Sequence, residues 1–346
     1  MTDSAGNTAN SYNYYTHLLG LPLYLFVPES GLHNLALPFQ TNPFLIAVKG
    51  DYSDAVVLAD KVSHRLGLLR DGGAMNPGRR AGMGTVMLHA VAHPQQGAQR
   101  TFHHYFQAVG SASGAIAAWE ATQLLLADGR FGDTVTQIHM AQNHPFVPIA
   151  SAWRAGRSEL IPMPDEQAYQ QVSAVTAAVL TNRKPPYAIA GGIHDVLRGS
   201  KGEAWEVTNE RLFLSANLFR TLEEIDIGPA ASVAVDALRQ AVAAGRVLPE
   251  ERVLLHITGG GREVQSKGEK IYTPLPEIVI EPDDIEGAVA AIGRPERIAP
   301  QHIFHTLKRY GAERPVSASE PARKAKPEHL PRSPAARAGR SKSRMT

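Results

Sequence analysis

A turn of small residues in the middle of the chain has the composition of a phosphate-binding site. The apolar run 105–109 predicts a buried strand, and residues 115–126 predict a helix. Between them lie Gly110, Ser111, Ala112, Ser113 and Gly114. Backbone N–H groups at a helix N-terminus favour an anion, glycine allows close approach, and serine hydroxyls add donors. The turn matches neither the P-loop nor Gly-x-Gly-x-x-Gly, and close packing of a strand on a helix would also explain it.

Two adjacent arginines are the second feature that suits an anionic ligand. Arg79 and Arg80 lie within residues 71–84, whose glycine content predicts a long loop rather than a helix or a strand. A guanidinium fork matches the geometry of an oxyanion, and long loops with concentrated charge often carry function. We expect these arginines to bind an anion; a surface loop with solvated arginines is the alternative.

The composition limits the class of protein. The chain has 346 residues, of which 43% are hydrophobic, which is enough for a large core divided between two domains. It contains no cysteine, which excludes a disulfide framework, a thiolate nucleophile and a zinc–sulfur site. No apolar run reaches membrane-spanning length, and the N-terminus lacks the layout of a signal peptide. We therefore expect a cytoplasmic protein without membrane contact.

Strands and helices alternate along the chain. Strands are predicted at 21–27, 43–48, 135–140 and 252–257, and helices at 51–68, 166–180, 210–222, 230–244, 284–291 and 300–309. This alternation favours parallel βαβ units, and glycine turns follow several strand ends. We predict an α/β protein with open parallel sheets and flanking helices, which binds ligands at the C-terminal ends of strands. Asp236, in the helix 230–244, is expected to be exposed.

The C-terminal tail differs from the rest of the chain. Residues 315–346 carry eight Lys and Arg against two Glu and few large apolar side chains, which predicts a basic disordered tail. Such a tail can contact nucleic acid, but it lacks interleaved aromatics, and a solvated extension is the favoured interpretation. We predict a small α/β domain over 1–92, incomplete at its start, and a large α/β domain over 93–314 that contains the phosphate-type turn.

Several motifs together resemble one enzyme family. Segments 4–8, 110–116 and 257–261 resemble the three cofactor loops of fold-type II pyridoxal phosphate enzymes, which have a two-domain, tryptophan synthase β-like fold. A more specific resemblance is to the cysteate synthases, in the threonine synthase-like branch. The segments that match this pattern, in family order, are 82–88, 104–110, 128–132, 143–146, 181–187 and 225–231.

The resemblance implies pyridoxal 5′-phosphate as cofactor, bound by the large domain. Residues 110–114 would cradle its phosphate, Asn7 would hydrogen-bond its ring hydroxyl, and Thr258 would face its pyridine nitrogen. A neutral hydroxyl does not enforce a proton on that nitrogen, and the weaker electron sink suits elimination at Cβ followed by addition of a nucleophile. Ala112 stands where the family has glycine. Backbone phosphate binding survives this change if φ at Ala112 is negative.

The family reaction replaces the phosphate of O-phosphoserine by sulfite and gives cysteate. Ser4, Asn7 and Thr8 would hold the substrate α-carboxylate, and Arg79 and Arg80 would supply positive charge for the anionic leaving group and nucleophile. The expected partners are a small anionic amino acid and further copies of the chain, in a dimer or a trimer. The alternatives are a threonine synthase-like lyase with another substrate and a lysine-free relative or fragment that binds the cofactor or another ligand without catalysis.

The lysine that forms the Schiff base in this family is not identifiable in the chain. In the family it precedes the segment that resembles residues 4–8, and this chain begins at that segment. Lys49, Lys184, Lys201 and Lys267 stand in other motifs. We therefore expect an N-terminally truncated sequence, from a misassigned start or a true truncation, and assign no catalytic residue.

Four histidines are the candidates for metal ligands. The residues in question are His103, His104, His139 and His144. Their spacing is not that of a metal site, and the family implies none. We expect packing or surface roles for them and no metal.

Overall fold

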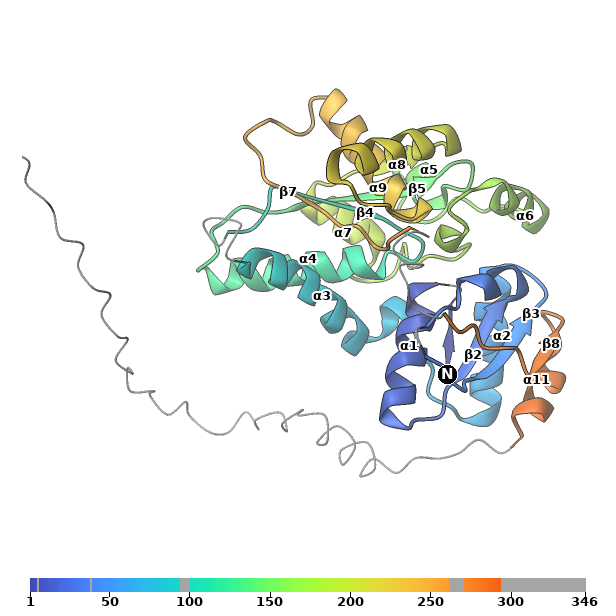
Figure 1. The fold of residues 1–346 in the computed structure, drawn as a ribbon. Coiled ribbons are helices and arrows are strands. Elements are labelled where there is room, and N and C mark those ends of the chain that lie inside the picture. The colour runs from blue at the N-terminus through green and yellow to red at the C-terminus, as the bar shows by residue number, and fades with distance from the viewer. Residues whose placement is uncertain (5, 38, 94–99, 262–270, 294–346) are drawn as a thin grey trace, which may run out of the picture. The chain divides into compact units, whose positions relative to one another are not determined.

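Two parallel four-stranded sheets organise the protein (Figure 1). The computed structural model describes residues 1–4, 6–37, 39–93, 100–261 and 271–293. All strand pairs within both sheets are parallel, and helices flank them, so the predicted α/β class with open parallel sheets is confirmed. None of the helices in these ranges is long and apolar enough to cross a membrane. The predicted helix 300–309 and the tail 315–346 lie outside the described residues.

The first sheet has the order β1-β2-β3-β8. Its strands are β1 (Thr2–Asp3), β2 (Tyr24–Pro28), β3 (Phe44–Val48) and β8 (Ile278–Ile280). Alternate residues of β2 and β3 face opposite sides, as a strand requires. One side packs on α2 (Tyr52–Leu66) and α11 (Ile285–Ile292), and the other packs on α1 (Asn7–Leu19). β8 thus belongs to the first sheet, and α11 packs on it. The predicted division into 1–92 and 93–314 places both of these elements in the other domain.

The start of α2 shows how local sequence fixes a helix end. Asp51 is the N-cap, and its side chain accepts a hydrogen bond from the Asp54 N–H, while the Asp54 side chain accepts one from the Asp51 N–H. Such a reciprocal capping box satisfies two orphan donors of the first turn. At the other end Gly67, with φ of 63°, supplies the left-handed residue that closes the helix.

The second sheet has the order β6-β5-β4-β7. Its strands are β4 (His104–Ala108), β5 (Gln137–Asn143), β6 (Ala204–Val207) and β7 (Val253–Leu255). The helices α3 (Pro77–Ala92), α4 (Ser113–Asp128), α5 (Pro148–Arg154) and α7 (Ile193–Ser200) share one core with this sheet. On its other face lies α9 (Pro229–Ala243), and α8 (Asn209–Glu223) packs with it. The remaining elements are α6 (Asp165–Ala174) and the 3-10 turns η1 (Glu29–Asn34), η2 (Gly73–Met75) and η4 (Ala178–Leu180).

The prediction of a long loop over 71–84 is wrong from residue 77 onward. Asn76 caps α3 by accepting from the Arg79 N–H at 3.2 Å, and Pro77 occupies the first turn, where a missing N–H costs nothing. Gly84 is needed where α3 crosses α4, because a Cβ there would lie 3.3 Å from the Ala117 carbonyl oxygen. Gly84 therefore serves close helix packing, and Arg79 and Arg80 are held on the first turn of a helix.

The prediction that Asp236 is exposed is also wrong. Its side chain is fully buried on α9, and it receives hydrogen bonds from Arg211, Ser215 and Gln240. α9 is covered on one face by the sheet and on another by α8, so a carboxylate on the second face is buried as well.

Candidate functional site

The turn before α4 has the features of an anion cradle. α4 begins after Ala112, and no side chain in the described ranges caps its first turn. The Ser111 and Ser113 hydroxyl oxygens lie 3.0 Å apart at the same place. Free backbone N–H groups, a helix dipole and two hydroxyls together favour an oxyanion. This arrangement supports the phosphate role predicted for residues 110–114.

Ala112 has a left-handed backbone. Its φ is 57° and its ψ is 15°, so the negative φ on which undisturbed phosphate binding would depend is not present. A left-handed alanine costs on the order of 1 kcal/mol relative to the right-handed region. A left-handed residue beside a helical one also directs successive N–H groups into one concavity, which suits an anion. The left-handed backbone at Ala112 is therefore consistent with a cradle. Glycine would adopt this conformation without strain, but the chain has alanine at this position.

Two glycines of the turn pack closely against neighbouring groups. A Cβ on Gly110 would lie 3.3 Å from the Leu180 backbone, and a Cβ on Gly114 would lie 2.7 Å from Gln107 Nε2. The cradle is thus closed on one side by η4 and underneath by the buried strand β4. No larger residue fits at either position without displacing these neighbours.

The first residues of α1 reach the other predicted cofactor loop. Asn7 Nδ2 donates a hydrogen bond to the Thr258 carbonyl oxygen at 2.7 Å, across 251 positions of sequence. On the other side of the same turn, a Cβ on Gly6 would contact Val179 Cγ1 at 3.4 Å. Because Val179 precedes Leu180, which borders Gly110, the segment of η4 connects the Asn7 turn with the cradle. The structure therefore brings Asn7 and Thr258 into contact and links both to residues 110–114.

Arg79 points at the same N-terminal turn. Its NH2 group donates to Thr8 Oγ1 at 3.1 Å, and its NH1 group is paired with the buried Asp71. Tyr12 donates to the other oxygen of Asp71, and burial with this contact raises the pKa of Tyr12. Ser4 Oγ accepts from the Gly6 N–H at 3.4 Å. Arg79 and Thr8 are thus placed together, but the charge of Arg79 is already neutralised by a carboxylate.

Arg80 has a different position. Its guanidinium pairs with Glu120 of α4 at 2.9 Å and donates to the Ala74 carbonyl oxygen at 3.4 Å. It therefore joins α3 to α4 and η2, and its contacts within the described residues do not include Ser4 or Thr8. Of the two predicted arginines, the structure brings only Arg79 to the N-terminal turn.

A cavity of about 400 Å³ has both the cradle and Arg79 on its wall. Ser111 lines it from the cradle, and Asp71 and Arg79 line it from the segment before α3 and from α3 itself. Arg183 and Lys184 form another part of the wall. A cavity of this size accommodates a small ligand beside the cradle.

Under the cradle lie buried polar side chains that sequence reasoning did not identify as part of the site. Tyr105 donates to Gln107 Oε1 at 2.7 Å, and its hydroxyl lies 2.6 Å from His256 Nδ1. Burial raises the pKa of Tyr105 and lowers the pKa of His256, so both are neutral. Gln107 supports Gly114, and His256 stands two residues before Thr258, so this network spans two loops of the site. Polar residues at alternate positions of a buried strand are the signal that could have revealed it.

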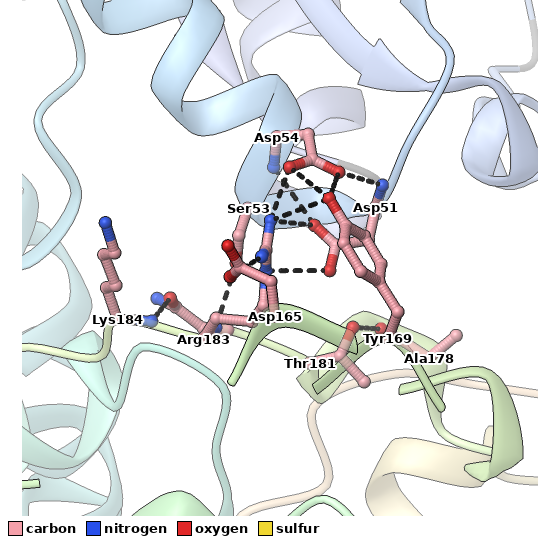
Figure 2. A network of polar contacts seen from close by, with 10 residues as sticks. Asp51, Ser53, Asp54, Asp165, Tyr169, Ala178, Thr181, Arg183 and Lys184 are labelled. Atoms are coloured by element: carbon pink, nitrogen blue, oxygen red, sulfur yellow. Dashed lines mark hydrogen bonds and ion pairs between the residues drawn. The ribbon is translucent and has the colours of Figure 1, made fainter. Parts of the chain in front are cut away.

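Figure 2 shows a second network, centred on Arg183. The guanidinium pairs with Asp51 at 3.0 Å, with Asp165 at 2.9 Å and, more closely, with Asp54. It also lies over the Tyr169 ring, 4.6 Å from its centroid. Burial and the neighbouring Asp54 carboxylate raise the pKa of Asp51, while Arg183 opposes that rise. The network, called the Arg183 clamp below, fastens the segment after η4 to the capping box of α2.

The four candidate histidines do not form a metal centre in the described residues, where no group of three or more His, Asp or Glu side chains is placed to hold an ion. His104 and His139 are buried and hydrogen-bonded to each other at 3.0 Å. His103 Nδ1 accepts from the Arg252 N–H at 2.9 Å. The contacts of His103, His104 and His139 are those of packed side chains, and His144 is exposed.

Residues 1–259 match the model of a family described as pyridoxal-phosphate dependent enzyme. The chain is 44% identical over 262 residues to a cysteate synthase of Methanoculleus marisnigri, covering 75% of this chain and 60% of the relative. It is 42% identical over 290 residues to a cysteate synthase of Methanocella arvoryzae, and the match covers 82% of this chain and 68% of the relative. The chain therefore spans between 60% and 68% of the length of these two curated relatives.

Two solved structures share the fold. A maize serine racemase matches with a TM-score of 0.55 at 14% identity, over 75% of this chain and 73% of that chain. A serine racemase from Dictyostelium discoideum matches with a TM-score of 0.51 at 14% identity, over 75% of each chain. At such identities the likeness shows the fold alone, and it confirms the fold type predicted from the sequence.

Proposed function

The chain belongs to the family of pyridoxal-phosphate-dependent enzymes, and from this premise we propose that it takes part in a β-replacement on a small anionic amino acid. The reaction proposed is that of a cysteate synthase, in which O-phosphoserine and sulfite give cysteate and phosphate. The Cβ–O bond breaks with release of phosphate, and a Cβ–S bond to sulfite forms. The observation that carries the proposal is the cradle before α4, linked through η4 to the contact between Asn7 and Thr258.

The residues present fit the cofactor of the family. The uncapped first turn of α4 and the hydroxyls of Ser111 and Ser113 would hold its phosphate, while Gly110 and Gly114 let the turn pack closely on Leu180 and Gln107. Asn7 and Thr258, which are hydrogen-bonded to each other, would both contact the ring. When bound, the cofactor supplies an electron sink for the substrate carbon atoms. As a neutral residue, Thr258 would place no fixed charge at the ring nitrogen.

The substrate is proposed to lie against the N-terminal turn. Ser4, Asn7 and Thr8 would orient its α-carboxylate, and Arg79 would fix Thr8 through the hydrogen bond at 3.1 Å. Arg80, held by Glu120, would stabilise the α3–α4 pair that carries the cradle rather than bind substrate. This assignment leaves the charge of Arg79 shared with Asp71, so part of the positive charge for a phosphate must come from elsewhere.

The second candidate is a relative that binds the cofactor without catalysis. The positions of the lysines in the described ranges favour it. The described ranges contain Lys49, Lys61, Lys184 and Lys201. Lys49 pairs with Glu281 at 2.8 Å at the end of β3, and among the four only Lys184 lines the cavity that Ser111 borders. A threonine synthase-like lyase that acts on another substrate would use the same cradle and remains the alternative within the family.

Titration of the protein with pyridoxal phosphate, followed by absorbance, tests the proposal. We expect saturable binding, with pyridoxal lacking the phosphate bound at least tenfold more weakly, because several charge-assisted hydrogen bonds to the cradle are lost. Borohydride reduction and peptide mapping then separate the candidates. A label on one lysine supports the enzyme, and a complex that reduction does not trap supports a binding-only relative. Equal affinity for pyridoxal and its phosphate would refute the cradle.

The oligomeric state is proposed from an exposed apolar row on α8. Leu214, Leu218 and Leu222 recur at helical spacing and are exposed, with Phe213 beside them. We propose a homo-oligomer, a dimer or a trimer, in the cytoplasm, without membrane contact and without nucleic acid as a partner. Light scattering measures the mass, and cell fractionation measures the location.

A further inference from the structure

The guanidinium groups on the wall of the cavity are all neutralised by carboxylates. Arg70 pairs with Asp3 at 2.9 Å and with Asp60 at 2.8 Å. Arg79 pairs with Asp71, and Arg183 is held by the aspartates of the Arg183 clamp. A paired arginine attracts an incoming anion much less than a free one, because its carboxylate cancels most of its field. The lining arginines therefore do not supply the charge that a sulfite or a phosphate needs.

Lys184 is the exception among the cationic residues that line the cavity. It is exposed, and no carboxylate of the described residues lies within ion-pair distance of its ammonium group. In Figure 2 its side chain extends away from the aspartates that hold the neighbouring Arg183. The cavity therefore contains one cation of the described chain whose charge is not cancelled by a partner.

The backbone of Lys184 is held on both sides. Its N–H donates to Asn182 Oδ1 at 2.9 Å, and the preceding residue, Arg183, is fixed by the clamp and donates its own N–H to Ser53 Oγ at 2.9 Å. After it come Pro185 and Pro186, whose rings fix φ. The Pro186 carbonyl oxygen accepts from the Ile193 N–H at 3.1 Å, at the start of α7. A flexible side chain is thus mounted on a rigid base at the cavity wall.

We propose that Lys184 is a specificity-determining residue. Its ammonium group binds an oxyanion of the reaction, sulfite or phosphate, in the cavity beside the cradle that holds the cofactor phosphate. This inference rests on the proposed function, and it identifies the missing positive charge that Arg79 and Arg80 do not provide. A lysine offers three N–H donors and a compact charge, which suits an oxyanion without demanding a bidentate geometry. Both sulfite, the proposed nucleophile, and inorganic phosphate, the proposed product, have this chemistry.

Calorimetric titration of the protein saturated with pyridoxal phosphate tests the inference, because the cradle is then filled and a further anion reports on the cavity. The variants are Lys184→Met, Lys184→Arg and, as a matched control, Lys61→Met, an exposed lysine on α2. Sulfite and phosphate are titrated separately. We expect Lys184→Met to weaken binding of at least one of them about tenfold, which is the typical effect of losing a charge-assisted hydrogen bond. Lys184→Arg and Lys61→Met should stay within about twofold of the wild type.

The outcomes separate this inference from the proposed function. If sulfite alone is weakened in Lys184→Met, the residue serves the nucleophile; if phosphate alone is weakened, it serves the leaving group. If the wild type binds pyridoxal phosphate and Lys184→Met binds both anions as the wild type does, the inference is overturned and the proposed function stands. If the wild type does not bind pyridoxal phosphate, the proposed function fails and the inference fails with it.

Discussion

Replacing Asp236 by alanine is expected to lower the free energy of unfolding by about 3 kcal/mol, the low end of the range for breaking a buried ion pair. The carboxylate is fully buried and accepts from Arg211 Nε at 2.8 Å, Ser215 Oγ at 3.0 Å and Gln240 Nε2 at 2.9 Å. Removing it leaves these donors without their shared acceptor. Arg211 and Arg239, which pairs with the same carboxylate at 3.3 Å, are both nearly half exposed and can turn to water, which is why the low end applies.

The control for Asp236 is an exposed carboxylate. Glu281 pairs with Lys49, and both side chains are more than half exposed, so Glu281→Ala should change stability by less than about 1 kcal/mol. Urea unfolding of the three proteins, followed by tryptophan fluorescence, gives both values. Similar losses for Asp236→Ala and Glu281→Ala would mean that the network between α8 and α9 is not a stabilising feature.

Acid is expected to destabilise the protein through His139. A directed chain of hydrogen bonds fixes its protonation: Trp205 Nε1 can only donate, and it donates to His139 Nδ1 at 3.3 Å. His139 Nε2 therefore carries the proton and donates to His104 Nδ1 at 3.0 Å. His104 Nε2 in turn donates to Glu251 Oε2 at 3.0 Å. In this arrangement His139 is neutral, and a further proton on it would have to displace the donation from Trp205.

Burial lowers the pKa of His139 from 6.5 to about 3. In the unfolded chain the pKa is near its ordinary value, so between pH 6.5 and 3 the unfolded state binds the extra proton and the folded state does not. The contribution of His139 to the free energy of unfolding is therefore fully present above pH 6.5 and is lost progressively as the pH falls below 6.5. The expected contribution is about 1.4 kcal/mol per pH unit, or roughly 2 kcal/mol between pH 6.5 and 5.

The variant His139→Gln isolates this contribution, because glutamine keeps an acceptor for Trp205 and does not titrate. Unfolding free energies of both proteins at several pH values between 6.5 and 4.5 are compared as slopes, which removes the constant cost of the substitution. We expect the slope of the variant to be smaller by about 1 kcal/mol per pH unit or more. Equal slopes would show that His139 is not the buried neutral group described above.

Short-range patterns in the sequence predicted the fold class and the strand–turn–helix at 105–126 well. The strand, the small-residue turn and the helix at 105–126 are local features, and β4 and α4 occupy this region as expected. The loop predicted over 71–84 failed because the purpose of Gly84 is visible only when α4 lies against α3. Likewise, the burial of Asp236 depends on α8 covering α9. In both cases tertiary packing decided what local composition could not.

The charges of the site could not be predicted from the residue types. Arg79 and Arg80 are adjacent in sequence, yet one pairs with Asp71 and the other with Glu120, because neighbouring residues on a helix face different sides. The contact between Asn7 and Thr258 spans 251 positions of sequence, and only the resemblance to a family indicated it. The roles of these residues toward a cofactor stay predictions, and the structure supports them by placing the loops together.

The central claim is that the first turn of α4 holds the phosphate of a cofactor whose ring lies at the contact between Asn7 and Thr258. The most direct measurement is a crystal structure of the protein grown with pyridoxal phosphate. The account predicts phosphate oxygens within hydrogen-bond distance of the backbone N–H groups of Ser113 and Gly114, and the ring against the side chains of Asn7 and Thr258. A cofactor bound with its phosphate away from residues 110–114, or with its ring away from that contact, would contradict it.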